Sequence, residues 1–131
     1  MTTTVKSIVD DVRQLLDVAA QTHYTDAQLA QYVVRGVQRM YAARPSSRYG
    51  ESGAIDDQTF PALAPDSASA QEKAAAIAAL LAFEVRVNEP RWRDGIVYFA
   101  AGCAHEVGIT DSVNLQLSQM HKKHAEEIFA N

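Results

Sequence analysis

The chain has 131 residues and a net charge of −4, and 47% of its residues are apolar while 21% are charged. This length fits one domain with one core over residues 1–131, and the composition is too apolar for an intrinsically disordered chain. The acidic balance disfavours a module that binds duplex DNA, because such modules neutralise phosphates with an excess of Lys and Arg.

A first helix is predicted over about residues 4–17, where apolar side chains recur at three- and four-residue steps on one face. Thr3 or Thr4 stands at its start, where a threonine hydroxyl can cap the first free amides. Only a short link, residues 19–24, separates this helix from the next segment with helical periodicity. We therefore expect the first two helices to form an antiparallel hairpin.

The second helix is predicted over residues 26–43. Thr25 and Gln28 have the spacing of a capping box, in which each side chain accepts a hydrogen bond from the backbone amide of the other residue. Pro45 disfavours helical geometry at the residue before it, so we expect the helix to end there.

Residues 44–69 are rich in Ser, Gly, Pro and Asp, and they predict one long loop in which Phe60 is a strong apolar anchor. Loops of about 25 residues are uncommon in compact domains and are usually functional or disordered. We expect this loop to reach other protein surfaces. A short strand near residues 58–63 is an alternative for part of it.

A third helix, predicted over residues 70–87, contains the run AAAIAALLAF and is apolar on every side. A helix without a polar face is normally buried all round. We therefore expect it at the centre of the bundle, and partial burial against a neighbouring copy is the alternative.

A proline in the first turn begins a fourth helix over about residues 90–107, and Gly108 is placed to end it. Thr110 or Asp111 then caps a fifth helix over about residues 111–129. The sequence thus predicts an all-α fold, a small helical bundle of about five helices with one long loop between helices two and three.

The predicted core draws on most of these helices. The apolar face of the fifth helix is formed by Val113, Leu117, Met120, His124 and Ile128. Across the bundle, the side chains that we expect to be buried include Leu29, Val33, Val37, Leu81, Val97, Leu117 and Met120.

No catalytic, metal or cofactor site is predicted. His121 and His124 lie three residues apart on a helix, but a metal site needs further ligands at compatible spacing. His105-Glu106 resembles the start of a metalloprotease pair, yet position 109 is Ile where the second histidine would stand. No phosphate-binding glycine loop, nucleophile elbow or Cys/His order is present, so we expect no enzyme.

Cys103 is the only cysteine and lies in the apolar run IVYFAAGCA, where a small buried thiol is the expected occupant and no disulfide framework exists. The N-terminal segment lacks the long apolar core of a signal peptide, and neither apolar run approaches the roughly 20 residues of a membrane span. We expect a cytoplasmic protein without a membrane contact.

Arginines follow the polar side of the second helix and continue into the loop, where a tyrosine lies beside them: Arg35, Arg39, Arg44, Arg48 and Tyr49. Such a row can contact an acidic protein surface or DNA phosphates, and the alternative is a set of solvated arginines that stack on Tyr41 or Tyr49. Residues 1–49 carry six basic and four acidic groups, whereas the remainder carries six and twelve. The arginines of one copy therefore complement the second half of another copy.

Trp92 lies between two arginines at the start of the fourth helix. Trp and Arg are enriched where protein interfaces gain most of their binding energy. A tryptophan that seals the corner of its own bundle is the alternative.

Residues 23–49, HYTDAQLAQYVVRGVQRMYAARPSSRY, combine an aromatic residue, a Thr-Asp-x-x-Leu start and a helix that ends in Arg-Pro-x-Ser-Arg-Tyr. DDQTFPAL follows at residues 56–63, and the closing helices contain RWRDGIVYFAAGCAHEV and SVNLQLSQMHKKHAEEIF. With these segments, most of the chain resembles the head-to-tail adaptor (connector) proteins of tailed bacteriophages.

The resemblance implies a structural virion protein that is not an enzyme and has no cofactor. It implies a ring of about a dozen copies beneath the portal protein, a tail or nozzle protein attached below, and packaged DNA passing through the lumen. Assembly would take place in the host cytoplasm, and the final place would be the head-tail junction of the virion. The candidate contact residues are Arg35, Arg39, Arg44, Arg48, Tyr49, Phe60 and Trp92. A dimeric helical regulatory or protein-binding module is the alternative function.

Overall fold

The computed structural model describes residues 3–16, 24–48, 58–87, 89–106 and 112–130. This part of the chain is all-α, as predicted, and it contains no regular β-strand. In chain order its helices are α1 (Val5–Leu15), α3 (Asp26–Ala43), the short 3₁₀ turn η1 (Pro45–Arg48), α4 (Ala70–Ala82), α5 (Pro90–Glu106) and α6 (Ser112–Ala130).

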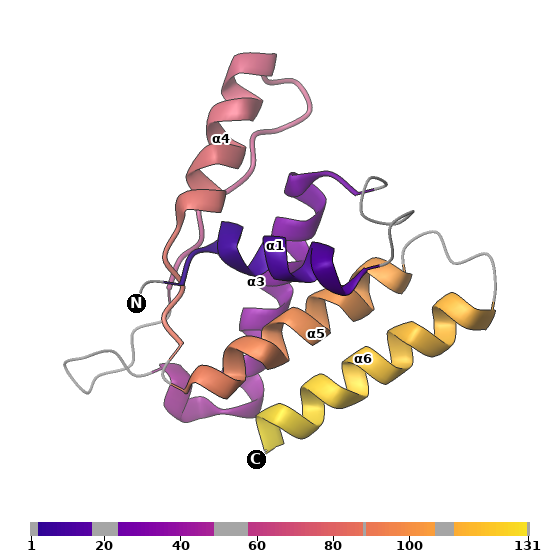
Figure 1. Cartoon of the computed structure of the whole chain (residues 1–131). Coiled ribbons are helices and arrows are strands. Elements are labelled where there is room, and N and C mark those ends of the chain that lie inside the picture. The colour runs from indigo at the N-terminus through magenta and orange to yellow at the C-terminus, as the bar shows by residue number, and fades with distance from the viewer. Residues whose placement is uncertain (1–2, 17–23, 49–57, 88, 107–111, 131) are drawn as a thin grey trace.

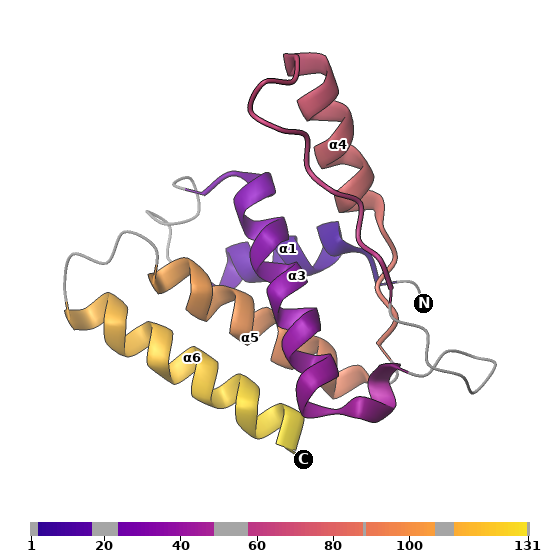
Figure 2. The same ribbon diagram turned by 180° about the vertical axis from the view of Figure 1, so that it is seen from behind.

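Four of these helices pack into one bundle, and α5 lies at its centre. α5 and α6 run antiparallel, side by side, and share the largest contact between any two helices (Figures 1 and 2). α1 and α3 also pack on α5. α1 crosses α3 and does not run alongside it, so the antiparallel hairpin predicted for the first two helices does not form.

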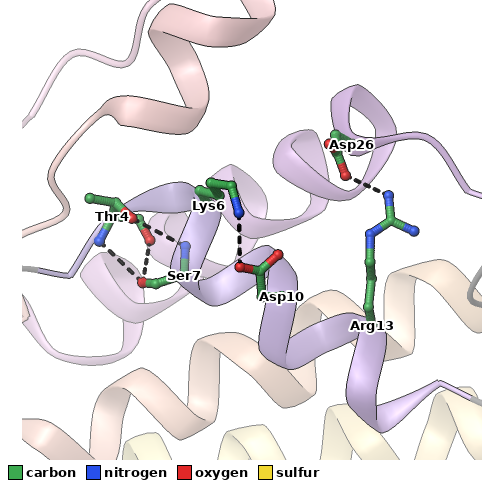
Figure 3. A network of polar contacts seen from close by, with 6 residues as sticks. All are labelled: Thr4, Lys6, Ser7, Asp10, Arg13 and Asp26. Carbon is green, nitrogen blue, oxygen red and sulfur yellow. Dashed lines mark hydrogen bonds and ion pairs between the residues drawn. The ribbon is translucent and has the colours of Figure 1, made fainter.

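Both threonine N-caps form, each as a capping box. At α1, Thr4 Oγ1 accepts from the Ser7 amide at 3.1 Å and Ser7 Oγ accepts from the Thr4 amide at 3.2 Å (Figure 3). At α3, Thr25 Oγ1 accepts from the Gln28 amide at 3.2 Å, and Gln28 Oε1 accepts from the Thr25 amide at 2.9 Å. These short-range bonds explain why the predicted bounds of the second helix match those of α3.

Glycines allow the helices to approach one another closely where they cross. A Cβ atom added at Gly36 of α3 would lie 3.1 Å from Ile96 Cγ2 and 3.2 Å from the Ile96 carbonyl oxygen on α5. A Cβ atom added at Gly95 of α5 would lie 2.5 Å from Cε1 of Phe129 on α6. The central position of α5 therefore depends on residues that have no side chain at the contact.

The helix predicted over 70–87 ends earlier, at Ala82. Residues 83–87 are extended and lie along the N-terminal segment, since the Val5 amide donates to the Phe83 carbonyl at 3.0 Å and the Val85 amide donates to the Thr3 carbonyl at 2.7 Å. The sequence FEVRV alternates apolar and charged residues, and this period favours an extended segment over a helix.

α4 does not lie at the centre of the bundle, so the predicted central position is wrong. It projects from the body in both views (Figures 1 and 2), and Leu80 is its only buried residue. Alanine methyl groups bury little area, so a helix made mostly of alanine gains less from the central place than α5 does with Ile96 and Trp92.

α6 faces the body with a different stripe from the one predicted. Its buried residues among those described are Ser118, Ala125 and Phe129. Met120 is 65% exposed, and Leu117 is half-buried. The predicted face is thus wrong at Met120 and at His124, which is also exposed, whereas Ile128 is half-buried and the side chain of Val113 lies outside the described residues. Gly95 on α5 leaves room for Phe129, and a pattern of large apolar residues does not reveal that fit.

Elsewhere the predicted core is confirmed in part. Leu29, Val33, Val37 and Val97 are buried, whereas Leu81 is half-buried. The buried hydrophobic residues of the described part are Val5, Ile8, Val9, Val12, Leu16, Leu29, Ala30, Tyr32, Val33, Val37, Met40, Leu80, Val85, Trp92, Ile96, Val97, Ala100, Ala101, Cys103, Ala104, Ala125 and Phe129.

Several predictions concern segments near the loops. The end at Gly108, the caps at Thr110 or Asp111 and residues 49–57 of the predicted loop lie outside the described residues. In the described part of that loop, residues 58–69 rise to the start of α4 without forming the alternative strand. Among the helices that the structure describes, none is both long enough and apolar enough to cross a membrane.

Candidate functional site

A surface groove lies between α3 and the extended segment that leads to α4. Its volume is about 720 Å³. α3 presents two glutamines, a valine and an arginine, and the opposite wall is the segment 58–63, with Leu80 at the base of α4. The lining residues are Gln31, Val34, Arg35, Gln38, Gln58, Thr59, Phe60, Pro61, Ala62, Leu63 and Leu80. Apolar side chains line part of the groove, but polar groups contribute more of its exposed surface than apolar groups do. Arg35 is the only charged side chain among the lining residues that the structure describes.

The outer wall of the groove is held by two hydrogen bonds of Gln58 and by a ring contact of Phe60. Gln58 Nε2 donates to the Glu84 carbonyl at 3.0 Å, and Gln58 Oε1 accepts from the Arg86 amide at 2.8 Å. Phe60 packs on Phe83, with ring centroids 4.9 Å apart. These contacts join residues 58–60, which precede α4, to residues 83–86, which follow it. The two extended segments therefore lie together at the base of α4.

Arg35 is the exposed member of the predicted arginine row, and it lies at the groove. Its guanidinium carbon sits 5.6 Å from the ring centroid of Tyr32, one turn earlier on α3. The sequence alternative placed the arginines on Tyr41 or Tyr49, whereas the ring contacted here is that of Tyr32. The contact holds the cation beside the groove.

Arg39 is paired within the chain. Its Nε and Nη2 donate to the two carboxylate oxygens of Glu126 at 2.5 and 2.6 Å. The hydrogen bond with Glu126 raises the pKa of the Arg39 guanidinium. The acidic second half of the sequence therefore supplies a partner for this arginine in the same molecule.

Arg44 and Arg48 lie at the end of α3 and in η1. Arg44 Nε donates to the backbone carbonyl of Phe129 near the end of α6. Arg48 is half-buried, and Tyr49 lies outside the described residues. The structure thus does not bring the predicted arginines together into one surface row.

Trp92 is only 5% exposed and is part of the core. This burial agrees with the alternative inferred from the sequence, a tryptophan that seals the corner of its own bundle. Its indole Nε1 has no hydrogen-bond partner in the described part of the molecule. Phe60, in contrast, is half-buried and lines the groove.

A cluster of aromatic and imidazole rings joins α5 to α6. His105 and His121 stack with centroids 5.3 Å apart, and Tyr98 contacts His124 edge to face at 4.4 Å. Burial lowers the pKa of His121 below its ordinary value, and the nearby His105 and His124 lower it further. Burial therefore favours the neutral form of the His121 imidazole, which packs between these two helices.

The chemistry of this cluster is limited by its composition. Within the ranges that the structure describes, no group of three or more His, Cys, Asp or Glu side chains is arranged to hold a metal ion. Cys103 is buried.

No protein-family model matches the chain. No curated protein and no solved structure matches it either.

Two features of the surface were missed from the sequence. The groove joins α3 to a segment more than twenty residues later in the chain, and the spacing of residues does not reveal that contact. His105 and Tyr98 join His121 and His124 only because α5 and α6 are antiparallel neighbours. The sequence did contain one signal, the alternation in residues 83–87. It indicates the extended segment to which Gln58 is hydrogen-bonded.

Proposed function

We propose that the chain is a structural adaptor of a tailed bacteriophage that forms a ring beneath the portal protein and joins the capsid to the tail. In this role a tail or nozzle protein binds below the ring, and packaged DNA passes through its lumen. The protein would assemble in the host cytoplasm and end at the head-tail junction of the virion.

The observation that carries the proposal is α4, an apolar helix that projects from a packed body. A ring of identical subunits needs a surface on each copy that fits a different surface on the next. A projecting element and a groove on the same chain are two such surfaces. The resemblance of residues 23–49 and 56–63 to the adaptor family supports the same role.

The charge of the chain also fits this role. A conduit for DNA should not hold the phosphates strongly, because each contact released during passage would slow it. The net charge of −4 and the pairing of Arg39 with Glu126 limit the number of cations available to DNA.

The proposal is tested by mixing the purified protein with the portal protein of the same phage and imaging the mixture by electron microscopy. We expect an additional ring of density on one end of the portal, and sedimentation of the two proteins together. A chain that stays dimeric in light scattering and does not bind the portal would contradict the proposal and favour the dimeric regulatory or protein-binding module.

A further inference from the structure

The arm of the molecule, defined as residues 64–82, exposes an apolar surface. Its tip is the turn before α4, and the helix returns from that tip to the body (Figures 1 and 2). Ala74, Ala75, Ala78 and Ala79 are all exposed, and Ile77 is only half-buried. Exposed apolar surface thus extends along the helix from Ala74 to Ala79.

This helix is poorly supported by its own chain. It has 13 residues, and isolated helices of about that length are marginal in water even when they are rich in alanine. Only Leu80, at its base, is buried in the body. A contact that covers the exposed alanines would therefore stabilise the arm.

The groove between α3 and residues 58–63 cannot receive the tip of its own arm. Leu80 lines the groove, whereas the tip precedes Ala70 at the opposite end of the helix. Thirteen residues of α-helix rise about 20 Å, so the tip stands well away from the groove. An arm that enters the groove must come from another molecule.

The charges of the tip and of the groove are complementary. Asp66 and Glu72 are exposed at the tip, and the half-buried Lys73 leaves the tip with an acidic balance. Arg35 is exposed and is the only charged residue among the described residues that line the groove. The apolar wall around Phe60 matches the alanines that follow the tip in the next turns of the helix.

We propose that the groove binds the arm of a second copy of this chain, with Arg35 facing the carboxylates of Asp66 and Glu72. The contact joins two different surfaces, the groove of one copy and the arm of the next, so it can repeat head to tail. Repetition of such a contact closes into a ring when the rotation permits. This inference deepens the proposed function, on which its biological role rests, but the contact itself requires no portal.

Two variants test the arm and the groove separately. Ala75→Gln with Ala78→Gln adds bulk and polar groups to the exposed side of the arm and preserves helix propensity. Arg35→Glu reverses the charge of the groove. The matched controls are Ala42→Gln on the exposed side of α3 and Arg91→Glu at the start of α5, since both positions are exposed and lie outside the groove.

Light scattering over a range of protein concentrations measures the result. We expect the wild-type chain and both controls to associate beyond the dimer, and each of the two variants to associate at least about tenfold more weakly. Circular dichroism should show the same helix content in all of them. An equimolar mixture of the two variants should form a one-to-one dimer, because one copy retains an intact arm and the other retains an intact groove.

Three results would overturn the inference. They are a wild-type chain that stays monomeric at its highest soluble concentration, an Arg35→Glu variant that associates like the wild type, and a mixture that forms no dimer. A charge exchange adds a further check, since Asp66→Arg and Glu72→Arg introduced into the Arg35→Glu chain should restore its self-association. Absence of that restoration would also count against the proposed contact.

Portal binding, measured on the same proteins, separates this inference from the proposed function. A ring on the portal that forms equally well with the Arg35→Glu variant would remove the arm contact and leave the adaptor role. Head-to-tail association without any binding to a portal would leave the arm contact and remove the adaptor role.

Discussion

Arg39 and Glu126 join α3 to α6 through two parallel hydrogen bonds of 2.5 and 2.6 Å. The two residues are 87 positions apart in the chain. A guanidinium and a carboxylate in this bidentate geometry orient each other as well as attract. The pair therefore sets the position of the last turns of α6 against α3.

We expect Glu126→Gln to lower the free energy of unfolding by about 1 kcal/mol or less, because both side chains are 41% exposed and solvent screens the pair. Urea denaturation measures the change. Glu127→Gln serves as the matched control on the next residue and should have a smaller effect. Equal effects of the two substitutions would show that the pair does not stabilise the contact between α3 and α6.

The contact between Gly95 and Phe129 makes α5 sensitive to a single methyl group. A Cβ atom at position 95 would lie 2.5 Å from a ring carbon of Phe129, and that ring is fully buried. We expect Gly95→Ala to destabilise the fold by about 1 to 3 kcal/mol, since overpacking outweighs the gain in helix propensity.

Phe129→Leu tests the cause of that loss. The smaller side chain should make room for the new methyl group, so the double variant should be more stable than the sum of the two single changes predicts. Thermal unfolding of the four proteins gives the coupling. Strict additivity would mean that the two residues do not clash.

The pKa of His121 predicts how stability depends on pH. Burial lowers this pKa in the folded state, so the unfolded chain binds the proton more readily. The free energy of unfolding should therefore fall as the pH decreases through about 6.5, the ordinary value for histidine, and this loss should be absent at higher pH.

Urea midpoints at about pH 7.5 and about pH 5.5 measure this dependence. Replacement of His121 by Gln removes the titrating group and should flatten the profile. His124→Gln, at an exposed position one turn later, is the control and should retain more of the slope. An unchanged slope in the His121→Gln variant would assign the acid sensitivity to other groups.

Leu29 and Met120 separate the predicted core from the observed one. The periodicity of the sequence predicts burial of both, but Leu29 is fully buried and Met120 is 65% exposed. Leu29→Ala should cost about 2 to 5 kcal/mol of stability, while Met120→Ala should change it by less than about 0.5 kcal/mol. Chemical denaturation compares them, and a comparable loss from both substitutions would place the predicted face of α6 in the core after all.

Local chemistry in the sequence determined the all-α class and the bounds of α3. The capping boxes at Thr4 and Thr25 involve residues three positions apart, so their hydrogen bonds form with the first turn of the helix and need nothing from the rest of the chain. Apolar periodicity likewise identified the inner faces of α1 and α3, where large apolar side chains at helical spacing are buried.

Only the tertiary structure decided where α4 lies and which stripe of α6 faces inward. The inner stripe of α6 depends on close approach to α5 at Gly95, which carries no periodic signal. α4 has only Leu80 buried against the body, and its apolar composition did not reveal this. The partner of Arg39 was hidden from the sequence for a related reason. Glu126 lies 87 positions away in the chain. A charge selects a partner by distance in space, and the order of residues does not determine that distance.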